Sequence, residues 1–151
     1  MQTNAQGTLA EISVVKRLLA DGFEVFLPIG GKTTHDILAY HSEFGIVSIQ
    51  VKSTTQVTKY GSYAVGLKSS RPNRTETVIH NFNSTAQDIL AVYLVELDAV
   101  LFYISANLTV KNQLTIKPLD AVNLAEVSLS EILGGVSRVG TSGSDLENRR
   151  L

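Results

Sequence analysis

The chain has no cysteine and no tryptophan among its 151 residues. Without cysteine it forms neither a disulfide nor a thiolate metal site, and a reducing compartment is expected. Long apolar runs are also missing, so we expect no membrane span. The first residues lack the charged and then apolar start of a secretory signal peptide. These absences predict an intracellular, cytoplasmic protein that does not interact with a membrane.

A strong net charge is missing as well. The 13 Lys and Arg residues nearly balance the 14 Asp and Glu residues, which leaves a net charge of −1. This balance argues against a protein that coats nucleic acid through bulk attraction. The distribution is uneven, however, because residues 51–75 hold five basic residues and no acidic one. The members of this basic stretch are Lys52, Lys59, Lys68, Arg71 and Arg74. Such a stretch can neutralise backbone phosphates, and the last four, with Lys32, are the candidate DNA-binding residues.

The length and the 44% hydrophobic content predict a single domain with its own core over residues 1–151. Residues 120–133 predict one or two short helices with Leu124, Val127, Leu129 and Leu133 facing inward, and the apolar segment 124–133 is also a candidate interface between copies of the chain. From about residue 134 the chain becomes polar and glycine-rich, which predicts a tail that is mobile or forms an interface.

The order of the expected elements is typical of an α/β protein. Residues 4–20 predict a helix with two neighbouring apolar stripes, one through Ile12 and Leu19 and the other through Val14 and Leu18. Expected strands and hairpins follow at residues 23–27, 35–40 with 45–52, 63–67, and 89–96 with 100–105. Residues 68–75 have the composition of a loop.

Three side chains in the first expected hairpin indicate chemistry. Gln50 and Lys52 are two residues apart in a strand, so they project from the same side. The hairpin carries Asp36 to the same end of the sheet. A carboxylate, an amide oxygen and a lysine that converge on one sheet edge suit metal-dependent cleavage of a phosphodiester.

Glu11 lies on the helix stripe that also holds Val14 and Leu18. One interpretation is a surface acid near the helix N-terminus. The other is a metal ligand, because an acid aligned with apolar residues is expensive to bury without a cation.

The pattern Asp36, 13 intervening residues, then Gln50-X-Lys52 resembles that of the PD-(D/E)XK nuclease superfamily. Glu11 occupies the place of the Glu in members that open with a helix. The two apolar segments at residues 88–105 look like the closing strands of the branch that contains intron-encoded homing endonucleases. His35 stands where many members have Pro, and Gln50 replaces the usual Asp or Glu, as it does in the homing branch among others.

The resemblance covers residues 7–105 and implies a nuclease core with a central mixed β-sheet flanked by helices. It implies Mg²⁺ held by Glu11, Asp36, the Gln50 side chain and the main-chain carbonyl of Val51. Lys52 would orient or deprotonate the attacking water. Together with Glu11, Asp36 and Gln50 it makes up the expected catalytic set.

The expected function is site-specific cleavage of double-stranded DNA by a homing endonuclease. Alternatives are a Holliday-junction resolvase, a repair or restriction nuclease, and a decayed protein that binds DNA without cutting it. Because one site cuts one strand at a time, a double-strand cut implies a homodimer or a homotetramer.

Overall fold

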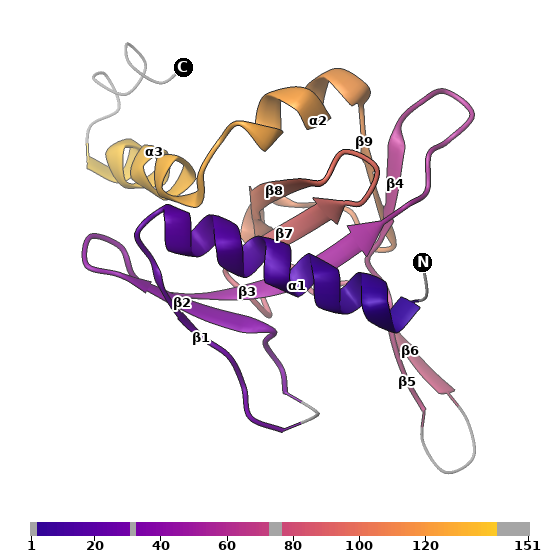
Figure 1. Ribbon diagram of the computed structural model, residues 1–151, viewed down its shortest axis with the longest axis horizontal. Coiled ribbons are helices and arrows are strands. Elements are labelled where there is room, and N and C mark those ends of the chain that lie inside the picture. The colour runs from indigo at the N-terminus through magenta and orange to yellow at the C-terminus, as the bar shows by residue number, and fades with distance from the viewer. Residues whose placement is uncertain (1–2, 31–32, 73–76, 142–151) are drawn as a thin grey trace.

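The computed structural model describes the chain over residues 3–30, 33–72 and 77–141, and its side chains over residues 4–30, 33–68 and 81–135. Figure 1 shows a mixed sheet with helices packed on it. The elements are α1 (Thr3–Ala20), β1 (Glu24–Phe26), β2 (Ile37–His41), β3 (Gly45–Thr54), β4 (Tyr63–Gly66), β5 (Ser69–Pro72), β6 (Thr77–His80), β7 (Ile89–Leu94), β8 (Ala99–Ile104), the 3₁₀ helix η1 (Ser105–Asn107), β9 (Gln113–Ile116), α2 (Pro118–Ala125) and α3 (Leu129–Thr141). No helix in these ranges combines the length and the apolarity that a bilayer span demands.

The main sheet has the strand order β1-β2-β3-β7-β8. β3 and β7 are parallel, whereas the other neighbouring strands are antiparallel. The sheet is therefore mixed, and β3 lies at its centre. Two further pairs, β4 with β9 and β5 with β6, form separate ribbons. This architecture confirms the predicted α/β core.

The core consists of two layers, one on each face of the main sheet. α1 and α3 pack on the first face, and Figure 1 shows α1 lying across the sheet. β4, β9 and α2 cover the second face over β7 and β8. Val14 and Leu18 of α1 are fully buried, but Ile12 is 59% exposed and Leu19 57% exposed. Of the two predicted stripes, only the second faces the sheet, because a helix on one sheet face has room for a single buried stripe.

A polar clamp fixes the parallel pairing in the centre of the sheet. The Ser48 main-chain N–H and hydroxyl donate to Asp88 Oδ2 over 2.9 and 3.3 Å, and the Asp88 main-chain N–H donates to Ser48 Oγ over 3.0 Å. Asp88 immediately precedes β7, so these bonds set the register in which Gln50 lies beside Leu90. They determine where β3 presents its polar side chains.

The C-terminal end of α1 is tied to α3. Asp21 accepts hydrogen bonds from the main-chain N–H and the hydroxyl of Ser130, over 2.8 and 2.7 Å. Arg17 donates to the carbonyls of Ala125 and Val127 over 3.2 and 3.3 Å. Both contacts hold α1 at a fixed position relative to the chain that follows β8.

One prediction needs correction, because residues 68–75, expected as a loop, belong in part to the β5–β6 hairpin. The sequence also did not predict β9. The first part of the expected tail from about residue 134 is helical, because α3 continues to Thr141, and its mobility or its place in an interface stays a prediction. Residues 142–151 lie outside the described residues.

The apolar side chains of residues 124–133 face inward, as predicted. Leu129 is 1% exposed, and Leu133 and Leu124 pack against the two core layers. This segment is occupied within its own chain.

Candidate active site

Asp36 lies where β2 begins to separate from β3. The last β2–β3 pair on this side is Ile37 with Ile49, so Asp36 stands next to Gln50. Its Oδ2 accepts hydrogen bonds from Gln50 Nε2 over 2.9 Å and from the Val51 main-chain N–H over 2.8 Å. The hairpin therefore brings the carboxylate to Gln50, as the sequence predicts.

Gln50 is half-buried, and the orientation of its amide follows from its partner. An ionised carboxylate only accepts hydrogen bonds, so the amide must turn its nitrogen to Asp36. Its Oε1 makes no hydrogen bond within the described side chains. The carbonyl of Val51 points to the same strand edge as its N–H, beyond the first residue of β2. Two neutral oxygens thus lie beside Asp36.

Glu11 is an exposed residue of α1, although it shares its stripe with the buried Val14 and Leu18. Partial burial of its carboxyl raises the pKa of Glu11, and repulsion from Asp36 raises it further. The two carboxylates are therefore close enough to interact. Over the described residues, no group of three or more His, Cys, Asp or Glu side chains is arranged so that it could hold a metal ion.

Lys52 is half-buried and follows Gln50 on the same side of β3. Burial lowers the pKa of Lys52, and the Asp36 carboxylate opposes that shift without cancelling it. A lowered pKa increases the fraction of neutral amine at a given pH, and only the neutral amine can accept a proton.

The residues fit a hard divalent cation. Two carboxylates, an amide oxygen and a main-chain carbonyl are all oxygen donors, which is the donor set that Mg²⁺ prefers. The repulsion that raises the pKa of Glu11 is also relieved when a cation binds between the two acids. Of the expected ligands, Asp36 is in contact with Gln50 and Val51, and Glu11 lies near enough to Asp36 for the two carboxylates to repel each other.

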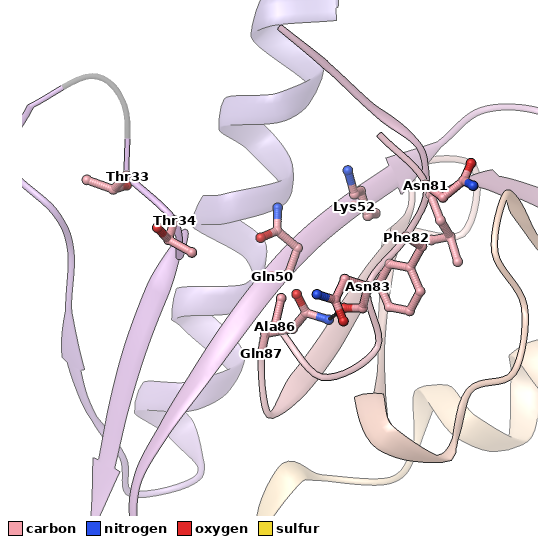
Figure 2. A pocket seen from close by; sticks show the side chains of 10 residues that line it. Thr33, Thr34, Gln50, Lys52, Asn81, Phe82, Asn83, Ala86 and Gln87 are labelled. Atoms are coloured by element: carbon pink, nitrogen blue, oxygen red, sulfur yellow. Dashed lines mark hydrogen bonds between the residues drawn. The ribbon is translucent and has the colours of Figure 1, made fainter. Parts of the chain in front are cut away.

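A cavity of about 360 Å³ opens next to this cluster. Figure 2 shows Thr33 and Thr34 on one side and Asn81 and Phe82 on the other, with Gln50 between them. The cavity lies between the β1–β2 linker, which contributes Thr33 and Thr34, and the chain that follows β6. The full lining consists of Thr33, Thr34, Gln50, Lys52, Leu67, Asn81, Phe82, Asn83, Ala86 and Gln87.

The wall formed by residues 81–87 was not predicted as functional. In the sequence this segment reads only as a turn before an apolar strand. Its place beside Lys52 depends on the docking of β7 against β3, which the local sequence does not reveal.

The predicted DNA-binding residues with described side chains, Lys59 and Lys68, lie on different segments. Lys59 is exposed and lies over the ring of Tyr60, with its ammonium 5.1 Å from the ring centroid. The β3–β4 linker that carries it and the β5–β6 hairpin project in different directions on the same side of the view (Figure 1). Lys68 is exposed just before β5, and the backbone of Arg71 lies in β5. Lys32 and Arg74 lie outside the described residues. That these residues bind DNA stays a prediction, and Lys59 and Lys68 lie on separate segments of the chain.

Comparison with known proteins gives a family and a fold. The family model described as PD-(D/E)XK endonuclease matches residues 1–123. Among solved structures, the bacterial homing endonuclease I-Ssp6803I superposes with a TM-score of 0.65 and 23% sequence identity, over 77% of this chain and 78% of that chain. At this identity the likeness concerns the fold alone. No curated protein sequence matches the chain.

Proposed function

The chain belongs to the PD-(D/E)XK endonuclease family and is a DNA endonuclease, and on that premise we propose that it is a site-specific, Mg²⁺-dependent homing endonuclease of double-stranded DNA. The observation that carries the proposal is the contact of Asp36 with Gln50 and Val51. The charge of Asp36 also influences the pKa values of Glu11 and Lys52, so both side chains lie within electrostatic reach of it. This is the set of groups that hydrolysis of a phosphodiester needs.

In the proposed mechanism Asp36 and Glu11 supply the negative charge of the metal site. Gln50 Oε1 and the Val51 carbonyl supply its neutral oxygens. Mg²⁺ bound there would polarise the phosphate and acidify the attacking water. Because Gln50 adds no charge, the site binds the cation more weakly than one with three acids, and a DNA phosphate oxygen completes it.

Lys52 has two proposed roles, one toward the proton of the attacking water and one toward the negative charge on the phosphate. Its lowered pKa permits the amine to take a proton from the attacking water, and the resulting ammonium then offsets the negative charge that grows on the phosphate. Asp36 helps to hold that ammonium, because its carboxylate favours the charged form.

The homing type is supported by the likeness of fold to a homing endonuclease and by glutamine at position 50. A junction resolvase or a repair or restriction nuclease would use the same groups. Cleavage of cruciform DNA in preference to linear DNA would favour the resolvase. Binding of plasmid without cleavage in Mg²⁺ would favour a decayed member.

A double-strand cut requires two sites, because each chain carries one Asp36 and one Lys52. We propose a homodimer or a homotetramer. The inward packing of residues 124–133 directs the search for its interface to other surfaces.

The central experiment is Asp36→Ala on plasmid DNA in Mg²⁺. We expect cleavage to be abolished and DNA binding to be largely retained, because the change removes the principal ligand and leaves the basic residues in place. Glu43→Ala is the matched control, since Glu43 is an exposed acid in the β2–β3 turn. Near wild-type cleavage by Asp36→Ala would refute the site.

A further inference from the structure

The cavity beside the proposed site has a polar wall that the cleavage mechanism does not use. This wall is the linker between β6 and β7, and Figure 2 shows its Asn83 and Gln87 side by side below Gln50. At about 360 Å³ the cavity falls in the size range of ligand pockets, roughly 300–1,000 Å³. The hydrogen bonds around the two amides determine what they offer to a ligand.

The amide of Asn83 has one orientation. Its Oδ1 accepts hydrogen bonds from the Thr85 main-chain N–H over 3.0 Å and from the Thr85 hydroxyl over 2.7 Å. A main-chain N–H can only donate, so the atom that faces it must be the oxygen. Asn83 Nδ2 is therefore left as a donor with a fixed position.

The amide of Gln87 is fixed in the complementary sense. Its Nε2 donates to the Asn83 carbonyl over 3.0 Å and to Ser105 Oγ over 2.7 Å. The carbonyl can only accept, and the Ser105 hydroxyl donates its own proton to the Ser84 carbonyl over 2.8 Å. Both N–H groups of Gln87 are thereby used, and its Oε1 is left as an acceptor.

A fixed donor next to a fixed acceptor matches one base better than the others. Adenine presents an acceptor, N7, beside a donor, the N6 amino group, whereas guanine presents two acceptors on the same edge. We infer that Asn83 and Gln87 read an adenine close to the scissile phosphate, with Asn83 Nδ2 donating to N7 and Gln87 Oε1 accepting from N6. The inference rests on the proposed function, because it takes the cavity to face the DNA that Lys52 helps to cut.

Burial gives this pair its discriminating power. Gln87 is only 8% exposed, and its Oε1 is not among the buried atoms without a partner, so it reaches water through the cavity. A base that enters the cavity without donating to Oε1 displaces that water and leaves the oxygen unpaired. An unpaired polar group at a buried position is penalised more than a matched one is rewarded. The pair therefore acts mainly by rejecting the wrong base.

The test is selection of DNA by the full chain from a pool of randomised duplexes. One arm sequences the duplexes that bind in Ca²⁺, and the other sequences the ends produced in Mg²⁺. Asn83→Asp keeps the oxygen that Thr85 needs and replaces the donor by a second acceptor. Asn83→Ser removes the Nδ2 donor without adding charge, because the shorter hydroxyl can accept from the Thr85 N–H but does not reach the position of Nδ2. Asn81→Asp is the matched control, because Asn81 is exposed in the same cavity and the change adds the same charge.

We expect the wild-type chain to enrich adenine at one fixed position next to the cut. Both Asn83 variants should reduce that preference by about five- to 150-fold, the range for loss of a good base contact, and Asn81→Asp should keep it. A wild-type chain that cuts without adenine enrichment, or Asn83 variants that keep it, would overturn this inference alone. A wild-type chain that neither binds nor cuts any duplex would overturn the proposed function, and this inference with it.

Discussion

Replacement of Gln50 by Glu is the sharpest test of how the site holds a cation. In the structure Gln50 Nε2 donates to Asp36 Oδ2 over 2.9 Å. Gln50→Glu turns this donor into a second carboxylate facing the first. Without a cation the two acids repel, and with one they both bind it. The variant should therefore lose stability in EDTA and recover it in Mg²⁺.

Two terms set the size of the loss. The hydrogen bond to the Asp36 carboxylate is worth about 1.5 kcal/mol or more, and it is lost. Two unit charges about 4 Å apart repel by about 4 kcal/mol at an effective dielectric constant near 20. The pair can instead take up a proton, which at neutral pH costs about 4 kcal/mol and limits the total. We expect a loss of about 2–4 kcal/mol in the free energy of unfolding, or about 6–12 °C in Tm for a chain of this length.

Thermal unfolding followed by circular dichroism, in EDTA and in millimolar Mg²⁺, measures both states. Mg²⁺ should raise the Tm of Gln50→Glu by more than it raises that of the wild type, because the variant binds the ion more tightly. Gln56→Glu supplies the same charge change at an exposed position after β3 and should respond to Mg²⁺ as the wild type does. If Gln50→Glu loses the same stability in EDTA and in Mg²⁺, the proposed cation does not lie between these side chains.

Three further outcomes are expected. The wild-type cleavage rate should rise with pH through the lowered pKa of Lys52, because only the neutral amine accepts a proton. Lys52→Arg keeps its charge at every pH, so it should lose this pH dependence and about 10²- to 10⁴-fold in rate. If the variant has the pH profile of the wild type, Lys52 acts as a fixed charge and not as a base. Lys68→Gln and Lys59→Gln should each reduce the slope of log affinity against log salt by about one unit, which is the loss of one phosphate contact; an unchanged slope would mean that the replaced lysine does not contact DNA. Asp21→Ala should lower the free energy of unfolding in urea by about 1–2 kcal/mol, because two donors of Ser130 lose their acceptor; a loss no larger than that of Asp21→Asn would mean that the charge of Asp21 adds nothing.

The site could be predicted from the sequence because its parts are local. Asp36 and Gln50 belong to one hairpin, whose register follows from strand alternation over a short stretch of chain. Lys52 then lies on the same side by the same rule. The choice between the two stripes of α1 could not be made in this way, because both repeat at helical spacing and only the position of the sheet decides between them.

The parts that could not be predicted depend on contacts between distant segments. β5 ends in Pro72, and proline is typical of loops and rare in the interior of sheets. It is tolerated here because, among the described residues, β5 pairs with β6 alone. β9 is four residues long and pairs with β4 across nearly fifty intervening residues. The orientation of Gln87 needs Ser105, which follows β8. None of these pairings leaves a periodic pattern in the sequence.

The central place of β3 in the sheet has a consequence for the synthesis of the protein. All the proposed catalytic and metal-binding residues lie before Thr54, but one edge of β3 stays unpaired until residues 89–94 arrive as β7. A ribosome-bound chain that ends earlier therefore carries the groups of a nuclease on a strand that lacks its neighbour and its Asp88 clamp. Parallel pairing over such a separation forms late, and an open central strand invites aggregation in the meantime. The chain should consequently be able to cleave DNA only after most of it has been synthesised, so shorter fragments should be inactive. The risk of misfolding is highest in the interval before β7 pairs with β3.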